Sequence, residues 1–270
     1  MNKTIAFIGA GVMAGAILKG ACRVFDPAQF LITDKMQGKA ETLAAELGCT
    51  AVSSNREAAE RADYIILCVK PQTVSAVLEE LALVLQASPK LICSILAGIT
   101  IETIRRMLGA PTYPVIRIMP NTPALIGKGT MLLACDKQVS EPARADILTL
   151  LAPCGEAIWL DESRFDQGTA LSGSSPAFVY LFIDALADAG AEVGIPRAEA
   201  LTLAARAAYG AAAMVLETGE TPTDLKNAVC SPGGSTIAGV NALEASGFHD
   251  TVGDAIRAAC ARNKELGALS

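Results

Sequence analysis

Short apolar runs alternate with helix-like stretches over residues 1–160. The first run, KTIAFIG (3–9), is followed by a helical pattern over 13–25 and by a second run, FLITD (30–34). The later runs are ADYIILCV, KLICSIL, PVIRIMP, GTMLLAC and EAIWL. Near-continuous apolar strands separated by helices are typical of a parallel sheet that is covered on both faces. The pattern therefore predicts an α/β fold with a doubly wound parallel sheet in the N-terminal part of the chain.

From residue 161 onward the sequence becomes Ala-rich and helix-forming. Ser175 and Pro176 either begin a helix as N-cap and first-turn residue, or Pro176 kinks a helix that begins earlier. A further helix, which starts at Pro196, is apolar around nearly all its circumference and must be buried on several sides. We expect two domains, 1–160 and an all-α domain over 161–270, with the Pro196 helix buried against another subunit. The alternative is that this helix forms the core of a monomeric bundle.

Composition narrows the function classes. Among 270 residues, 22 are Lys or Arg and 28 are Asp or Glu, so the net charge is −6, and aromatic residues make up 4%. This balance provides no basic surface for nucleic acid and few rings for stacking bases. The apolar segments around 64–69 and 91–101 are too short to span a membrane. No signal peptide precedes the first strand-like run, so we expect a cytoplasmic protein with no membrane partner.

The eight cysteines show no C-x-x-C pair, and no metal site is expected. Most of them are expected to be small buried apolar residues in a reducing compartment. Cys230 adjoins a Gly-rich loop, so a nucleophilic thiol is an alternative to a packing role there. A histidine would normally activate such a thiol, and the only one, His249, lies in a GFHD segment that we expect to be a surface loop.

A glycine loop follows the first strand directly and opens a helix. It has the form Gly9-x-Gly11-x-x-Ala14, in which Gly9 makes the tight turn, Gly11 admits a pyrophosphate and Ala14 permits close helix–strand packing. Asp34, at the end of the second strand, could accept hydrogen bonds from a free ribose 2′-hydroxyl, which favours NAD. Lys35 could instead bind a 2′-phosphate, which favours NADP. The sequence thus predicts a dinucleotide site and leaves the choice of cofactor open.

A second anion-binding pattern lies more than two hundred residues later, in VCSPGGSTIAG (229–239). Bare backbone N–H groups and hydroxyls would here lie at the positive end of a helix. A nicotinamide enzyme that oxidises an alcohol needs a general base, usually His or Lys. The chain has one His and no Lys between Lys137 and Lys226. A protonated C=N substrate needs only to be positioned, so the composition favours an imine reductase.

Seven segments, in this order and over nearly the whole chain, resemble those of pyrroline-5-carboxylate reductases. They are FIGAGVMAGAI, VKPQ, SILAGI, IMPNTPA, LSGSSPAF, DAGAEVGIP and VCSPGGSTIAG. The resemblance implies an N-terminal Rossmann domain followed by a helical dimerisation domain. It also implies reduction of 1-pyrroline-5-carboxylate to L-proline, the last step of proline biosynthesis, by hydride transfer from NADPH, with NADH as an alternative. A homodimer is implied, and a decamer built from dimers is allowed.

The same resemblance assigns the site residues. The substrate carboxylate is held by the second loop, and Thr236 approaches the ring nitrogen as the catalytic residue. The substrate residues are Ser231, Gly233, Gly234, Ser235, Thr236, Met119, Asn121 and Glu162, of which Met119 and Asn121 close the pocket and Glu162 lies near the nitrogen. The cofactor residues are Gly9, Ala10, Gly11, Val12, Met13, Ala14, Asp34, Lys35, Asn55, Val69, Lys70, Pro71, Ala97 and Gly98.

Two other classes of protein, and one other role for Thr236, are alternatives to this interpretation. A β-hydroxy-acid dehydrogenase of comparable architecture is disfavoured by the missing helix lysine. A regulator that binds the dinucleotide without turnover is disfavoured by the intact SPGGST loop. Thr236 itself could be only the N-cap of the helix after that loop, which would give it a role in stability alone.

Overall fold

The computed structural model describes residues 2–268 and divides into two compact units. Unit 1 comprises Met1–Ser174 together with Ala259–Ser270, and unit 2 comprises Ser175–Ala258. The domain boundary expected at 160/161 stays a prediction. The contacts within the chain divide the chain after Ser174, and from Ala259 onward the chain belongs to unit 1 again.

Unit 1 is built on one eight-stranded sheet with the order β3-β2-β1-β4-β5-β6-β7-β8. The strands are β1 (Ile5–Ile8), β2 (Phe30–Thr33), β3 (Thr50–Ala51), β4 (Tyr64–Leu67), β5 (Leu91–Ser94), β6 (Val115–Met119), β7 (Gly129–Ala134) and β8 (Gly155–Trp159). All the expected strands are present, and β3 is an additional one. The order reverses at β1, which lies between β2 and β4, as in doubly wound dinucleotide-binding folds.

The sheet is mainly parallel, as expected, and contains one antiparallel pair. β6 and β7 are antiparallel, with Arg117 opposite Ala134, whereas β7 and β8 are parallel. Only the short segment 120–128, which contains the 3-10 helix η3 (Thr122–Ile126), joins β6 to β7. A parallel pair needs a crossover of a dozen or more residues, so this connection can only reverse the chain.

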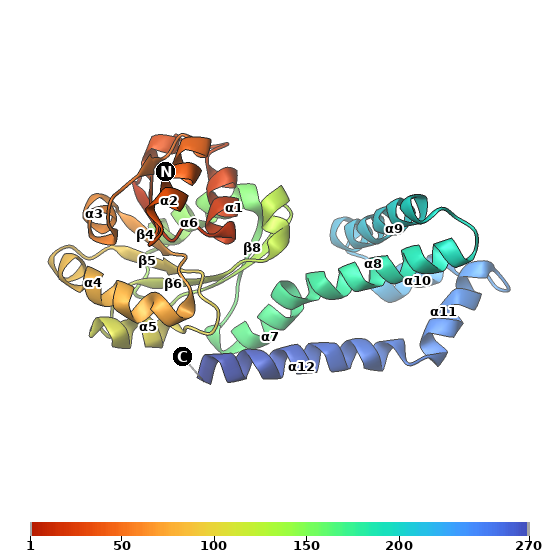
Figure 1. Ribbon diagram of the computed structural model, residues 1–270. Coiled ribbons are helices and arrows are strands. Elements are labelled where there is room, and N and C mark those ends of the chain that lie inside the picture. Colours follow the sequence, from red (N-terminus) through yellow and green to blue (C-terminus); the bar gives the residue numbers. More distant parts are fainter. Residues whose placement is uncertain (1, 269–270) are drawn as a thin grey trace. The chain divides into compact units, whose positions relative to one another are not determined.

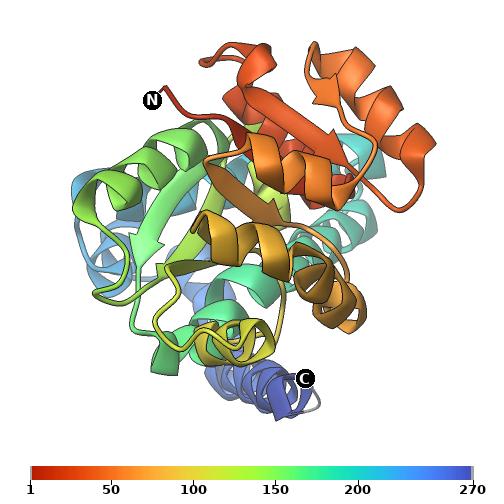
Figure 2. The ribbon, with the colours of Figure 1, turned by 90° about the vertical axis from the view of Figure 1, so that its left-hand side faces the viewer.

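Helices cover both faces of the sheet (Figures 1 and 2). One apolar cluster joins the sheet to α3 (Asn55–Arg61), α4 (Val74–Ala87) and α5 (Ile101–Leu108). The other joins it to α1 (Val12–Ala21), α2 (Gln37–Leu47) and α6 (Glu141–Leu151). Central strands such as β1 and β4 are therefore buried on both faces, which explains their uninterrupted apolar sequences.

A long helical run leads out of unit 1. It comprises α7 (Phe165–Thr169), a π-helical segment η6 (Ala170–Ser174) and α8 (Ser175–Glu192). The helix therefore begins before Pro176, as in the second of the two expectations, while the kink expected at Pro176 stays a prediction. Pro176 has no backbone N–H to donate within this run, and the π segment η6 ends at Ser174, two residues before it. The whole run from Glu162 to Glu192 is long and apolar enough, by length and composition, to cross a membrane.

Unit 2 is entirely helical. After α8 it contains α9 (Arg197–Thr218), α10 (Pro222–Val229), α11 (Ser235–Ala245) and the first part of α12 (Phe248–Ala268). α8 packs against α9, where Ala200 meets Gly190 closely enough that a Cβ on the glycine would lie 2.8 Å away. Phe182 of α8 also contacts Phe248 of α12, with 6.2 Å between ring centroids. Small residues thus permit the close approach of α8 and α9.

Candidate functional site

The glycine loop joins β1 to α1. Gly9 has a φ of +107°, and a Cβ there would lie 2.6 Å from the carbonyl oxygen of Cys68, so only glycine fits. Its N–H donates to the carbonyl oxygen of Thr33 at 2.8 Å. Gly11 is the N-cap of α1, and the space that its Cβ would occupy is open. The N–H groups of the first turn of α1 have no intrahelical acceptor, which is the arrangement that binds a pyrophosphate.

Asp34 follows β2 and is tied to the glycine loop. Its Oδ2 accepts the N–H of Ala10 at 2.8 Å, and its Oδ1 accepts the N–H of Met36 at 2.8 Å. Each carboxylate oxygen has a second lone pair for a ribose hydroxyl. Asp34 therefore holds two loops at the edge of the sheet, and this positioning role was not foreseen from the sequence.

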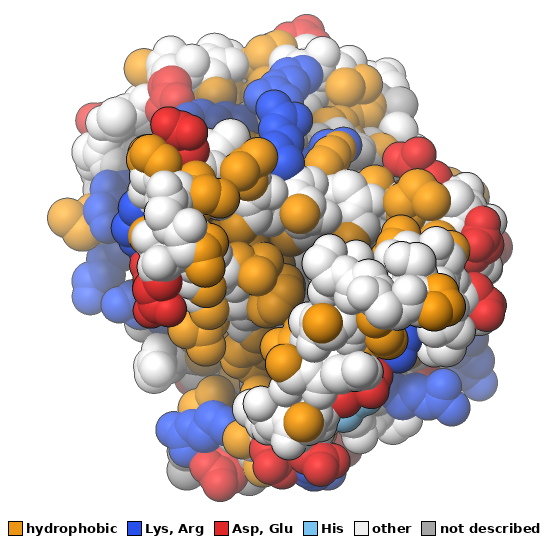
Figure 3. All heavy atoms as spheres, turned by 90° about the vertical axis from the view of Figure 1, so that its right-hand side faces the viewer, with side chains coloured by type: hydrophobic (Ala, Val, Ile, Leu, Met, Phe, Trp, Pro, Cys, Tyr) orange, Lys and Arg blue, Asp and Glu red, His pale blue; other side chains and the backbone are white. Residues whose placement is uncertain are grey.

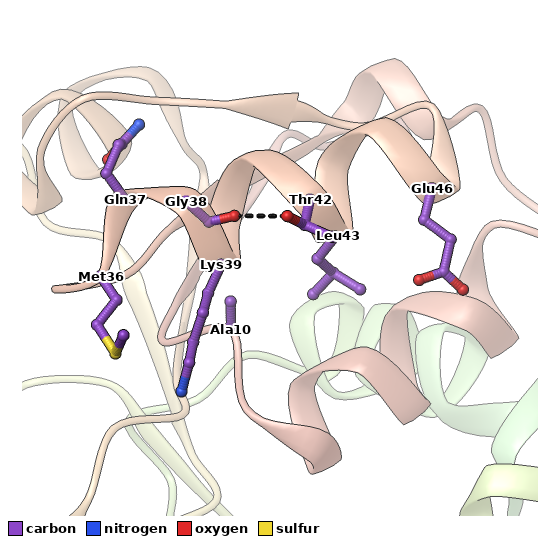
Figure 4. Close-up of a pocket in the computed structure, with 8 residues that line it drawn as sticks. All are labelled: Ala10, Met36, Gln37, Gly38, Lys39, Thr42, Leu43 and Glu46. Carbon is purple, nitrogen blue, oxygen red and sulfur yellow. Dashed lines mark hydrogen bonds between the residues drawn. The ribbon is translucent and has the colours of Figure 1, made fainter.

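A cavity of about 610 Å³ opens between the glycine loop and α2. Its lining is Ala10, Met36, Gln37, Gly38, Lys39, Thr42, Leu43 and Glu46. Figure 4 shows Lys39 extending from the first turn of α2 toward the side on which Ala10 lies. Lys35, the expected phosphate contact, is exposed and is not part of this lining. Lys39 was missed, although its place two residues after the start of α2 puts a cation beside a helix N-terminus.

The other expected cofactor residues follow strands on the far side of β1. Val69, Lys70 and Pro71 come after β4, and Ala97 and Gly98 come after β5. The carboxyl ends of these parallel strands share one edge with the glycine loop, and that edge is where doubly wound folds bind dinucleotides.

Two polar residues that were expected near the cofactor or substrate already have internal partners. Asn55 begins α3 and donates its amide to Glu80 Oε2 at 2.8 Å. Asn121 is buried, donates to the carbonyl oxygen of Ser172 at 2.8 Å and accepts the N–H of Thr130 at 2.9 Å. Asn121 thus fixes the turn after β6, while its contact with substrate stays a prediction.

The second loop lies in unit 2, between α10 and α11. Gly233 has a φ of +72°, and the N–H of Gly234 donates to the carbonyl oxygen of Ser231 at 3.0 Å, which closes a tight turn. A Cβ on Gly234 would meet Ser231 Oγ at 2.6 Å. An ion pair of 3.0 Å between Lys226 and Glu244 joins the two helices that flank the turn.

The N-cap of α11 is Gly234, which has no side chain to cap the helix, so Ser235 and Thr236 are the first two helical residues. The alternative in which Thr236 serves as the N-cap is therefore wrong. The side chains of Ser231, Ser235 and Thr236 are exposed. The free N–H groups of the first turn and these hydroxyls form a place suited to a carboxylate.

His249 and the cysteines contribute no recognisable catalytic pair. His249 is exposed but lies in the first turn of α12, which corrects the expected loop. Burial raises the pKa of the Cys154 thiol to about 11, and it raises that of Cys49, which contacts Cys22, to about 12. Cys230 is half-buried as the C-cap of α10. A raised thiol pKa disfavours the reactive thiolate, which agrees with packing roles for Cys49 and Cys154.

A glycine loop, an acidic residue after β2 and a strand order that reverses at β1 define a dinucleotide-binding protein of the Rossmann class with an added helical unit. Residues 4–98 match a family described as "NADP oxidoreductase coenzyme F420-dependent". Residues 162–266 match one described as "Pyrroline-5-carboxylate reductase dimerisation".

Full-length relatives agree with these matches. The chain is 40% identical over 268 residues to a pyrroline-5-carboxylate reductase of Escherichia coli, covering 98% of this chain and 99% of the relative. A solved pyrroline-5-carboxylate reductase of Coxiella burnetii superposes with a TM-score of 0.93 at 32% identity, covering 98% and 99% of the two chains. That of Plasmodium falciparum, solved with NADP bound, gives 0.85 at 30% identity, covering 98% of each. The chain belongs to the pyrroline-5-carboxylate reductase family.

Proposed function

We propose that this chain reduces 1-pyrroline-5-carboxylate to L-proline with NADPH, and that the SPGGST turn holds the substrate carboxylate. The names of the relatives support the reaction, and the exposed hydroxyls and free N–H groups at the start of α11 carry the proposal for the turn. In the overall reaction, the cyclic imine, a hydride and a proton yield proline. NADPH supplies the hydride when it is bound.

The carboxylate of the substrate is proposed to accept the N–H groups at the start of α11, with Ser231 and Ser235 assisting. As the hydride reaches the neighbouring carbon, the imine nitrogen accepts a hydrogen bond, or a proton that is relayed to it from solvent through a hydroxyl. Thr236 is the proposed donor, because its hydroxyl lies one residue beyond Ser235 in the same exposed turn. The C=N carbon needs no enzymic base, which accords with the scarcity of His and Lys.

Thr236→Ala and Thr236→Ser test this role. A positioned proton-transfer group contributes about 10²–10⁴-fold in rate, so the alanine variant should lose that much in kcat and the serine variant should keep most of it. NADPH affinity, measured by fluorescence titration, should be unchanged in both. Near-normal turnover of Thr236→Ala would remove Thr236 from the mechanism.

Thr221 provides a matched control in the same unit. It is the N-cap of α10, and its hydroxyl accepts the N–H of Asp224 at 3.1 Å. Thr221→Ala should lower stability by about 1 kcal/mol without lowering kcat.

The assay is NADPH consumption with pyrroline-5-carboxylate, with piperideine-6-carboxylate and 3-hydroxyisobutyrate as comparisons. Turnover of the hydroxy acid alone would favour a dehydrogenase, and NADPH binding without turnover would favour a regulator.

The helical unit is a dimerisation domain, and we propose that α9 lies in an obligate dimer interface. Of the apolar side chains on α9, Leu203 is 59% exposed and Leu216 is 85% exposed within one chain. Apolar side chains are widely exposed in the space-filling view of Figure 3. Surface of this kind marks a protein interface. A decamer of such dimers is a further proposal, which sedimentation will also measure.

Leu203→Lys should yield monomers in sedimentation velocity. Leu83→Lys, at a position on α4 that is 72% exposed, is the matched control and should leave the dimer intact. A folded, active wild-type monomer at nanomolar concentration would contradict the obligate dimer.

The apolar helix Glu162–Glu192 is proposed to face other protein helices, so the protein should be recovered in the cytoplasmic, membrane-free fraction.

A further inference from the structure

Arg117 is a charged residue in the middle of a buried strand. Its side chain is 4% exposed, and its guanidinium lies 4.5 Å from the ring centroid of Phe165. Nη1 donates to Glu162 Oε1 at 3.1 Å, whereas the buried Nε has no hydrogen-bond partner among the described residues. A buried cation is costly unless it is paired, so Arg117 depends on Glu162 for its charge partner.

Glu162 in turn holds the start of α5. The same Oε1 accepts the N–H of Ile101 at 2.9 Å, and Ile101 is the first residue of α5. Thr100 caps the same end through the N–H of Thr103. Glu162 is thus the second acceptor at this helix end, and its negative charge lies at the positive end of the helix dipole.

The segment 95–100 runs from the end of β5 to this anchored helix start. β5 lies two strands from β1, on the side away from β2. The adenosine half of a dinucleotide lies on the β2 side, where Asp34 and the cavity beside α2 are found, and the second nucleotide half lies on the β4 and β5 side. The segment 95–100 would therefore lie on the side of the nicotinamide half of a bound dinucleotide, and the Arg117–Glu162 pair anchors its far end.

We propose that Arg117 and Glu162 are positioning residues for the nicotinamide half of the cofactor. This rests on the proposed function only in that the chain uses a nicotinamide dinucleotide. The carboxylate of Glu162 is engaged with Arg117 and Ile101, so it acts on the reaction through the segment 95–100. Loss of the Glu162 carboxylate should weaken the binding of the nicotinamide half of the cofactor and leave the binding of the adenosine half unchanged.

The test compares NADPH with 2′-phospho-ADP-ribose, which lacks the nicotinamide. Glu162→Ala should raise the Kd of NADPH about tenfold, as expected for loss of one well-placed interaction, and lower kcat. The Kd of 2′-phospho-ADP-ribose should stay within about twofold of wild type. Glu162→Gln keeps an acceptor for the N–H of Ile101 and should recover part of the NADPH affinity.

A second variant covers the case in which Glu162→Ala fails to fold. The double variant Arg117→Met with Glu162→Leu leaves no lone buried charge and no side-chain acceptor for the N–H of Ile101, and it should fold. It should show the same selective loss of NADPH affinity. Equal weakening of both ligands, or of neither, would overturn the proposal. Because both measurements are made without substrate, they remain readable even if pyrroline-5-carboxylate is not reduced.

The Arg105–Asp136 pair is the matched control. Arg105 lies on the same helix, and its guanidinium donates to both oxygens of Asp136, at 2.6 and 3.0 Å, and to the carbonyl oxygen of Tyr113. Tyr113 precedes β6, so this pair lies toward the edge of the sheet opposite the carboxyl ends of the parallel strands. Asp136→Asn should leave both affinities unchanged. A selective loss of NADPH affinity in this variant would also overturn the proposal.

Discussion

Asp34 accepts the backbone N–H of Ala10 at 2.8 Å across 24 residues of chain. The bond fixes the glycine loop from outside, because Asp34 belongs to the loop after β2. Asp34→Ala should therefore raise the KM of NADPH and NADH by similar factors, since the loop serves both cofactors. Steady-state kinetics with each cofactor measures this. An effect on NADH alone would show instead that the carboxylate acts mainly on the ribose 2′-hydroxyl.

Lys39 lines the cavity beside α2, and Lys35 precedes that helix. If a 2′-phosphate occupies this cavity, Lys39→Ala should lower the NADPH/NADH ratio of kcat/KM about two- to fivefold, as expected for one exposed ionic contact. Lys35→Ala should lower the same ratio if the sequence-based hypothesis is correct. A ratio unchanged in Lys35→Ala and lowered in Lys39→Ala would assign the contact to Lys39, and a ratio unchanged in both would exclude both lysines.

Gly20 in α1 faces Cys154, and a Cβ at this glycine would lie 2.6 Å from the thiol sulfur. Because Cys154 is fully buried, Gly20→Ala should overpack this contact and lower the free energy of unfolding by about 1–3 kcal/mol. Adding Cys154→Ala should restore part of the loss. Both are measured by urea denaturation.

Gly15, in the same helix, is the control for Gly20. A Cβ there would make an ordinary contact of 3.6 Å with Leu43, so Gly15→Ala should be neutral or stabilising by about 1 kcal/mol. A Gly20→Ala variant as stable as Gly15→Ala would show that the contact between α1 and Cys154 relaxes without cost.

The guanidinium of Arg105 holds the pKa of Asp136 below its usual range. Because the folded-state pKa lies below the unfolded-state value of about 3.9, the stabilisation is complete above that value and is lost as the pH falls through the folded pKa. Asp136→Asn should therefore be less stable than wild type at pH 7, and the difference should shrink below about pH 4. A difference that does not depend on pH would contradict an ionic contribution.

Strand positions and the glycine loop could be predicted because both are local properties. Apolar runs mark strands, and the positive φ of Gly9 and the position of Asp34 at the end of β2 follow from short stretches of sequence. An apolar run marks a strand but not its direction, so the one antiparallel pair, β6–β7, was not predicted from the runs. β3 contains only two residues, too few to produce a pattern.

Long-range contacts could not be predicted in this way. Glu162 lies 45 residues from Arg117 and 61 from Ile101 along the chain, so no local pattern reveals that they meet. The family resemblance placed Glu162 near the substrate nitrogen, and that contact stays a prediction. The structure adds that this carboxylate has two internal partners. Lys39 was missed for a simpler reason, since Lys35 was nearer to Asp34 in sequence and α2 begins only at Gln37.

The last helix belongs to both units, and this affects the order in which the ribosome can complete them. All of unit 2 is synthesised after Ser174 and before Ala259, where the chain re-enters unit 1. Asn263 then donates its amide to the carbonyl oxygen of Asp166 at 3.0 Å, and Leu266 lies against Gly98. These contacts join residues that are translated far apart in time. The loop after β5 can therefore contact Leu266 only after the whole of unit 2 has been synthesised.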